Sequence, residues 1–154
     1  KMYPSLRSFD SAIDMAGGVG RISKLLVEKF ENVDIEDISR KYLRKAKLNC
    51  PKLRHFYTTP IQDFKYRHQY DLILMFWGLC QIYKDSELVQ ALVRAREALT
   101  PKDRRGSKSG VILIKENTIS KADKRKNEHK ALDRTCEQYI KLFTRAGLEL
   151  AYEP

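Results

Sequence analysis

The sequence predicts an α/β fold: a doubly wound, mainly parallel sheet with helices on both faces. Strand-like and helix-like segments alternate along the chain, as in sheets built from right-handed crossovers. Residues 70–77 form a continuous apolar run, which is typical of a strand buried on both faces. Residues 16–20 include three glycines, which suit a tight turn between a strand and a helix. With 154 residues, we expect one domain, 1–154.

The first half of the chain is expected to hold three strands and two helices. Helices are assigned where apolar residues recur at helical spacing, and strands where short apolar or β-branched runs occur. Ser39 is the expected cap of the second helix, and Pro51 follows its end. The expected elements are, in order, a strand at 11–15, a helix at 20–30, a strand at 32–37, a helix from 39 to about 49, and a strand at 53–58.

The second half is expected to add three strands and two helices. Asp85 is the expected cap of the third helix, Pro101 follows its end, and Gly147 closes the fourth. The expected elements are, in order, a strand at 70–77, a helix at 86–99, a strand at 110–116, a helix at 133–146, and a strand at 148–152.

Composition excludes several classes of protein. No apolar run approaches the roughly 20 residues that a membrane span needs, so we expect no membrane partner. Cys50, Cys80 and Cys136 are odd in number and have no CxxC spacing, which disfavours a disulfide framework and a zinc finger. We expect no metal site. Such cysteines fit a reducing compartment, the cytoplasm or nucleus.

The net charge of +10 is concentrated in one part of the chain. Residues 101–130 carry 10 Lys or Arg against 4 Asp or Glu. A basic segment at 102–130 could meet nucleic acid, an acidic protein or anionic lipid, or it could be a solvated surface. The segment contains no aromatic residue on which bases could stack.

The glycine turn is the most informative motif. Its small residues Ala16, Gly18 and Gly20 would let a ligand approach the backbone, and Asp37 follows at the distance expected of a ribose-binding acid. The GxGxxG pattern of a dinucleotide site such as that for NAD needs a third glycine for helix packing. This chain has Ser23 there, which is tolerable but departs from the pattern. Together with Asp14 before the turn, the pattern favours S-adenosylmethionine over NAD.

Several segments together resemble the alpha-N-terminal protein methyltransferases, which are class I (Rossmann-like) S-adenosylmethionine-dependent enzymes. The family methylates the N-terminal amine of proteins that begin with an Xaa-Pro-Lys-like sequence. The resemblance extends from about residue 9 to residue 154 and is carried by residues 14–23, 33–38, 61–64, 70–73, 114–117 and 143–148. It also implies that an N-terminal lid and a last strand are missing from this chain.

The resemblance implies a role for each matching residue. Ala16, Gly18, Gly20 and Phe76 would line the methyl donor, and Arg21 would bind its methionine carboxylate. The remaining implied roles are ribose binding for Asp37, adenine binding for Ile61 and Gln62, packing of the substrate's second residue for Trp77, and anchoring of the substrate's N-terminal end for Asn117.

The sequence departs from the family pattern at four positions. Ala16 replaces a glycine, and Phe76 replaces a glutamine. Gln81 replaces a histidine, and His129 stands near the position of an aspartate. The replaced histidine and aspartate draw the proton from the amine. Only a neutral amine can attack the donor, and glutamine cannot titrate, whereas histidine titrates near neutral pH. His129 is therefore either a substitute base or an unrelated loop residue.

Three functions remain open from the sequence. The first is an active methyltransferase of protein N-termini. The second is a catalytically inactive relative that serves as a binding subunit in a larger assembly, which Ala16, Phe76 and Gln81 favour. The third is an RNA methyltransferase that uses the basic segment 102–130. The residues Met75 to Gly78 exclude the N6-adenine type, which needs a D/N-P-P-aromatic motif there.

Overall fold

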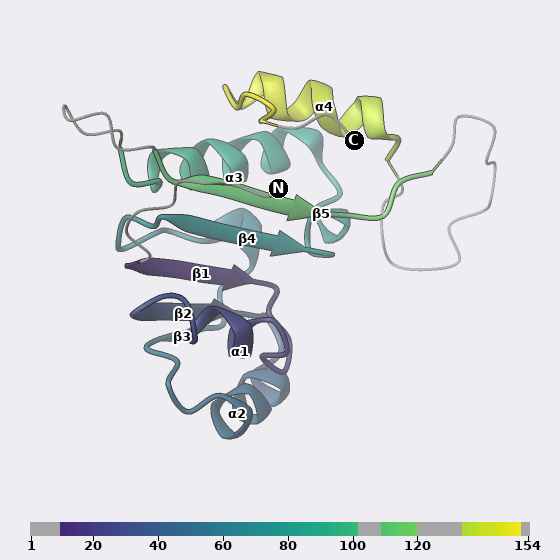
Figure 1. Cartoon of the computed structure of the whole chain (residues 1–154). Helices are drawn as coiled ribbons and strands as arrows, with labels where there is room; N and C mark the ends of the chain where they lie inside the picture. Colours follow the sequence, from purple (N-terminus) through teal and green to yellow (C-terminus); the bar gives the residue numbers. More distant parts are fainter. Residues whose placement is uncertain (1–9, 102–108, 120–133, 152–154) are drawn as a thin grey trace.

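Five parallel strands form a single sheet in the order β3-β2-β1-β4-β5 (Figure 1). The computed structural model describes residues 10–101, 109–119 and 134–151. The elements are β1 (Ser11–Met15), α1 (Ser23–Leu26), β2 (Asn32–Glu36), α2 (Arg40–Asn49), β3 (Phe56–Tyr57), η1 (Ile61–Asp63), β4 (Leu72–Phe76), η2 (Leu79–Gln81), α3 (Asp85–Glu97), β5 (Val111–Lys115) and α4 (Cys136–Arg145). The predicted doubly wound parallel sheet is confirmed.

Two apolar cores cover the two faces of the sheet. Side chains alternate between the faces along each strand. In β1, Ile13 and Met15 face the core formed with α3 and α4, whereas Ala12 faces the core formed with α1 and α2. In Figure 1, α3 and α4 lie near β4 and β5, and α1 and α2 lie near the β2–β3 edge. The central strand β1 therefore lies between the two helical layers.

Side-chain caps fix the start of two helices. Ser39 Oγ accepts a hydrogen bond from the Tyr42 N–H at 3.3 Å, as predicted for α2. A capping box starts α4: Thr135 Oγ1 accepts from the Gln138 N–H, and Gln138 Oε1 accepts from the Thr135 N–H. Residue 133, the expected start of this helix, lies outside the described residues.

The predicted cap of α3 is wrong. Helix α3 begins at Asp85 itself, and Lys84 at the cap position makes no side-chain capping bond. The Asp85 carboxylate instead pairs with the Arg134 guanidinium at 2.9 Å. A long-range ion pair thus replaces the local cap.

Two elements are shorter than expected. Only Ser23–Leu26 of the predicted helix at 20–30 is α-helical, and turns flank it. Only Phe56–Tyr57 of the predicted strand at 53–58 is a β-strand, although Arg54 and His55 also exchange backbone hydrogen bonds with β2.

The predicted strand at 148–152 is not found in its described part, residues 148–151. Gly147 has φ +73° and ends α4, and the Leu148 N–H bonds back to the Phe143 carbonyl at 3.0 Å. Arg96 also donates to the Ala146 carbonyl at 2.8 Å. Helix-ending hydrogen bonds thus hold the first residue after Gly147, and residues 148–151 make no strand pairing.

Strand β5 forms one edge of the described sheet. Its side chains alternate between half-buried and exposed, with Val111 and Leu113 exposed and Ile112 and Ile114 packed against the core of α3 and α4. Within the described residues, no helix has the length and apolarity needed to cross a membrane.

Candidate functional site

The predicted site residues gather where the parallel strands end. The glycine turn follows β1, Asp37 follows β2, Trp77 follows β4, and Glu116 and Asn117 follow β5. Carboxyl ends of parallel strands meet at one edge of a sheet, which is where such folds bind ligands (Figure 1). We call the part around residues 14–23 and 36–37 the donor side, and the part around 77–81 and 115–117 the acceptor side.

The glycine turn contains backbone conformations that residues other than glycine adopt only at a free-energy cost. Ala16, Gly18 and Gly20 have φ values of +55°, +59° and +79°. A Cβ added at Gly18 would meet nothing within 4 Å, so open space lies beside this residue. A Cβ at Gly17 would lie 2.7 Å from the Ile35 side chain, so Gly17 is needed for packing. The turn is both open to a ligand and tightly packed underneath.

Three carboxyl groups support the turn from below. Asp14 Oδ2 accepts from Ser23 Oγ at 2.6 Å, and Glu36 Oε2 accepts from the Ala16 N–H at 3.1 Å. Burial raises the pKa of Asp14 to about 6 and the pKa of Glu36 to about 8. The charge of neighbouring Asp37 contributes to both of these shifts, less than burial does. Glu36 was not among the predicted site residues.

Asp37, the predicted ribose-binding residue, is buried beside the turn. Its Oδ2 accepts from the Gly18 N–H at 2.9 Å, and its Oδ1 accepts from the Ser39 N–H at 2.7 Å. Each oxygen keeps a further lone pair for a hydroxyl donor. Arg21 is exposed just before α1, on the same turn.

The predicted adenine-binding residues pack against both sides of the site. A Cβ added at Gly78 would lie 2.7 Å from Ile61 Cδ1 and 2.9 Å from Ala16 Cβ. The methyl group of Ala16 therefore lies against Gly78. The backbone carbonyl of Gln62 accepts from Arg94, which anchors η1 on α3. The loop after β4 thus touches both η1 and the glycine turn.

On the acceptor side, Trp77 stands in an unusual backbone conformation. Its φ is +56°, and its N–H donates to the Lys115 carbonyl at 2.9 Å. The residue is 43% exposed, which disfavours a purely core role. Lys115 Nζ lies 4.8 Å from the ring centroid, and Phe76 contacts the ring edge-on at 5.8 Å.

The other predicted acceptor residues are exposed near Trp77. Gln81 follows in η2, and its side-chain amide contacts the Cys80 sulfur at 3.6 Å. Asn117 follows β5 and is exposed. His129 lies outside the described residues, so the structure does not test it.

Glu116 joins the two acceptor segments, and the sequence analysis gave it no role. Its Oε2 accepts from the Leu79 and Cys80 N–H groups at 2.9 and 3.1 Å, and its Oε1 accepts from the Asn117 N–H at 2.9 Å. One carboxylate therefore fixes η2 on the end of β5. Its place in the 114–117 motif was the available signal.

Arg134 is a second residue that sequence reasoning missed. It is buried, and it donates to Asp85 Oδ1 and to the Ile82 carbonyl at 3.0 and 2.8 Å. These bonds hold the segment between η2 and α3 against the start of α4. Nη1 of Arg134 and the hydroxyl of Tyr139 are buried without a hydrogen-bond partner among the described residues.

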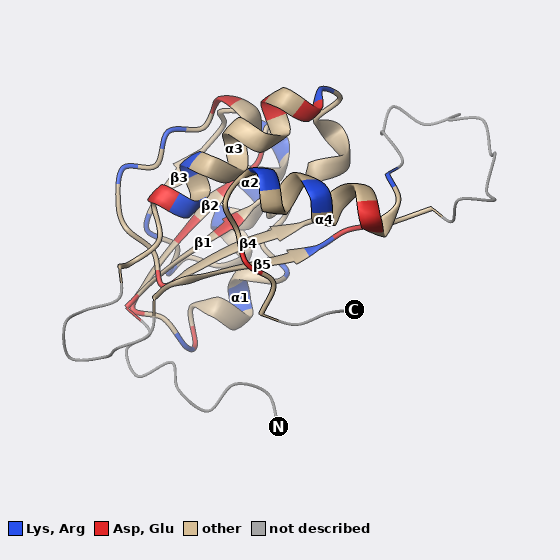
Figure 2. Ribbon diagram, turned by 90° about the horizontal axis from the view of Figure 1, so that it is seen from above, with Lys and Arg blue, Asp and Glu red and all other residues tan. Residues whose placement is uncertain are grey.

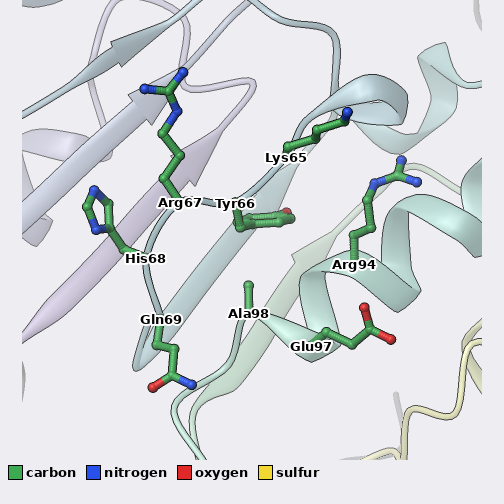
Figure 3. Close-up of a pocket in the computed structure, with 8 residues that line it drawn as sticks. All are labelled: Lys65, Tyr66, Arg67, His68, Gln69, Arg94, Glu97 and Ala98. Carbon is green, nitrogen blue, oxygen red and sulfur yellow. The ribbon is translucent and has the colours of Figure 1, made fainter.

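Basic residues are distributed over several helices (Figure 2). Most of the predicted basic segment, residues 102–108 and 120–133, lies outside the described residues. Within them, α2 carries five Lys or Arg in ten residues and no acidic residue. A cavity of about 400 Å³ lies away from the donor turn, before β4 and at the end of α3, and is lined by Lys65, Tyr66, Arg67, His68, Gln69, Arg94, Glu97 and Ala98 (Figure 3).

Comparison with known proteins identifies relatives of this chain. It is 30% identical over 145 residues to alpha N-terminal protein methyltransferase 1 of Dictyostelium discoideum, covering 90% of this chain and 51% of that protein. It is 29% identical over 148 residues to N-terminal Xaa-Pro-Lys N-methyltransferase 1 of Danio rerio, covering 92% and 63%. The chain thus spans about half to two thirds of the length of these curated relatives.

Solved structures agree with the fold. A SAM-dependent methyltransferase from Leishmania major superposes with a TM-score of 0.82 at 26% identity, covering 99% of this chain and 60% of that one. A methyltransferase from Clostridium acetobutylicum superposes with a TM-score of 0.75 at 17% identity, covering 94% and 75%, which supports the fold alone. In sequence, residues 1–153 match the family described as AdoMet-dependent proline dimethyltransferases. The chain therefore belongs to this family of class I methyltransferases.

Proposed function

We propose that this protein transfers a methyl group from S-adenosylmethionine to the N-terminal α-amine of other proteins. One observation carries the proposal: the open glycine turn with Asp37 and the exposed pair Trp77 and Asn117 all lie at the carboxyl ends of the strands. Relatives named as N-terminal Xaa-Pro-Lys N-methyltransferases give the substrate class. The single domain, 1–154, would be the core of the enzyme, which we place in the cytoplasm or nucleus.

The donor side fits S-adenosylmethionine. Asp37 would accept from the ribose hydroxyls, Arg21 would bind the methionine carboxylate, and the backbone at Gly18 and Gly20 would lie along the donor. Ile61 and Gln62 would cover the adenine, with Ala16 and Phe76 completing the wall. The open space beside Gly18, together with an acid within hydrogen-bonding distance of its N–H, supports this fit. When bound, the sulfonium of the donor supplies the methyl group.

The acceptor side would position the amine. Trp77 offers an exposed ring for the substrate's second residue, and Asn117 offers an amide for its N-terminal end. Gln81 can orient an amine by hydrogen bonding but cannot take its proton. Proton removal needs a titratable group, and His129, which stands near the position of the family's aspartate, is the candidate that the resemblance offers. Holding the amine in line with the donor provides the rest of the acceleration.

Calorimetry with S-adenosylmethionine tests the donor site. We expect micromolar binding by the wild-type protein and its loss in Asp37→Ala. Asp71→Ala is the matched control: Asp71 has the same 8% exposure and also accepts two backbone N–H bonds, but it lies at the opposite end of the sheet. Equal loss in both variants would contradict a specific role of Asp37.

Mass spectrometry of a peptide that begins with Xaa-Pro-Lys tests the transfer. We expect an added methyl mass on the free N-terminus and none on the same peptide acetylated there. Donor binding without turnover would indicate instead the inactive binding subunit of a larger assembly. Methylation of RNA but not of the peptide would favour the third function that the sequence left open.

A further inference from the structure

Three metal-binding side chains meet at the β3 edge of the sheet, away from the donor turn. Asp34 lies within β2 and is fully buried, whereas His55 before β3 and His68 before β4 are exposed. One ligand atom from each residue lies within 4.8 Å of the other two. His55 Nδ1 is 3.0 Å from Asp34 Oδ1, and the two imidazole rings stack at 5.6 Å.

We propose that Asp34, His55 and His68 bind a divalent transition metal ion of the zinc type. Two imidazole nitrogens and one carboxylate oxygen are a ligand set that Zn²⁺ uses, with the fourth position left to water. Ligand atoms around tetrahedral Zn²⁺ are about 3.3 Å apart, which follows from bonds of about 2.0–2.1 Å. Asp34 Oδ1 and His55 Nδ1 now share a hydrogen bond of 3.0 Å, which the ion would replace at a slightly longer separation.

His68 is the ligand that must move. Its ring nitrogens make no hydrogen bond to another described side chain, and the residue is exposed. His68 lies at the rim of the nearby cavity, where Figure 3 shows its ring on the side away from Arg94 and Glu97. Metal binding would bring its ring nitrogen closer to the other two ligands and would replace the stacking of the two rings.

Arg54 and Tyr70 hold the carboxylate in place for this role. Arg54 donates to both oxygens of Asp34 at 2.9 and 2.8 Å, and the Tyr70 hydroxyl donates to Oδ2 at 2.6 Å. Such partners behind a metal ligand fix its orientation. The guanidinium also repels a cation, so we expect micromolar affinity instead of the tighter binding of an all-cysteine zinc site.

A bound ion would connect three segments at the β3 edge of the sheet. Strand β3 is short, Phe56–Tyr57, and backbone hydrogen bonds of Arg54 and His55 extend its pairing with β2. The ion would link the start of β3 and the loop before β4 to β2. Because it binds the folded chain, it should raise the melting temperature by about 5–10 °C at a free concentration near 100 times its dissociation constant.

Calorimetric titration of the full-length protein with ZnCl₂, without methyl donor, tests the proposal. We expect one Zn²⁺ per chain and at least about tenfold weaker binding in His68→Ala. Because His68 is exposed, this variant should fold normally. Gln69→Ala is the matched control, since Gln69 is the exposed neighbour of His68 in the same loop and is not one of the three ligands, and it should bind Zn²⁺ like the wild type.

Spectroscopy with Co²⁺ separates this site from the cysteines. Binding at Asp34, His55 and His68 gives no sulfur-to-cobalt charge-transfer absorption, whereas binding at a thiolate does. No binding, unchanged binding in His68→Ala, or charge-transfer absorption from the bound ion would each overturn the proposal. Because the readout is metal binding and melting temperature, failure here leaves the proposed methyl transfer untouched, and failure of methyl transfer leaves the metal site untouched.

Discussion

The donor side and the acceptor side of the site are built in different ways. On the donor side, the nearly buried carboxyl groups of Glu36 and Asp37 bond the backbone of the glycine turn. On the acceptor side, Trp77 and Asn117 are exposed, and Glu116 bonds the loop after β4 to the end of β5. The donor side is part of the core, whereas the acceptor side is attached to its surface.

This difference predicts whether a substitution changes the global stability of the domain or only its local order. A change within the core alters the free energy of unfolding of the whole domain. A change in an exposed loop alters local opening, which is independent of global unfolding. Donor-side variants should therefore change global stability, and acceptor-side variants should change local order and turnover.

The largest effect is expected from Glu36→Gln and depends on pH. Burial raises the pKa of Glu36 to about 8 in the folded chain, above its ordinary value. The folded chain therefore favours protonated Glu36. The free-energy cost of ionising this group in the fold is absent below its pKa in the unfolded chain, grows as the pH rises, and is complete above about pH 8. Glutamine resembles the protonated acid and keeps an oxygen for the Ala16 N–H, so the variant should be more stable at pH 9 by on the order of 5 kcal/mol.

Urea unfolding at pH 5 and pH 9 measures this effect. The two proteins should have nearly equal free energies of unfolding at pH 5 and diverge by pH 9. The variant should still lose some stability between pH 5 and 7, because it keeps Asp14, whose pKa burial raises to about 6. Parallel pH dependence of the two proteins would show that Glu36 is ionised in the fold without cost, and the comparison of the two sides would lose its main support.

Gly17→Ala should have the next largest effect. The new Cβ would lie 2.7 Å from the Ile35 side chain and 2.9 Å from Asp14 Cγ, so the core must shift by overpacking. We expect a loss of about 1–3 kcal/mol in the free energy of unfolding. Gly18→Ala is the control: its φ of +59° carries the backbone cost of about 1 kcal/mol, but its Cβ meets nothing within 4 Å. A larger loss at Gly18 would contradict the packing argument.

Glu116→Gln should give a smaller and local effect. The amide keeps one oxygen for the three N–H groups that the carboxylate accepts from, so we expect a cost of about 1–2 kcal/mol for opening this loop. Amide hydrogen exchange at Leu79 and Cys80 should become faster, and kcat/KM should fall while donor affinity stays unchanged. Glu97→Gln, on the surface of α3, should change neither. Weakened donor binding in Glu116→Gln would show that the two sides are coupled.

The fold could be predicted because it depends on local patterns. Apolar runs and their spacing identified the five strands of the sheet and the three longer helices, and Ser39 was correctly assigned as a cap. The failures depend on contacts distant in sequence. Arg134 takes Asp85 away from the capping role, and residues 148–151 do not join the sheet, because strand formation depends on a neighbouring strand that is distant in sequence.

The candidate site could be predicted only in part for the same reason. The glycine turn and Asp37 are a continuous motif at a characteristic spacing, so their proximity followed from sequence. Glu36 reads in sequence as one more polar residue near a strand end, and only the folded structure shows that it is buried under the turn. His55 and His68 belong to separate loops, and nothing local predicts that they meet at Asp34.

The smallest effect is expected from Lys115→Met. The ammonium lies 4.8 Å from the exposed ring of Trp77, and such a contact contributes about 0.5–1 kcal/mol. Trp77 is the only tryptophan, so its fluorescence reports the acceptor side alone. Removing the cation should change the emission of the folded protein, while the unfolding midpoint followed by circular dichroism moves little. Lys141→Met on exposed α4 should leave the emission unchanged. If Lys115→Met instead lowers global stability as much as Gly17→Ala, the acceptor side belongs to the core after all, because an exposed cation–π contact cannot account for a loss of that size.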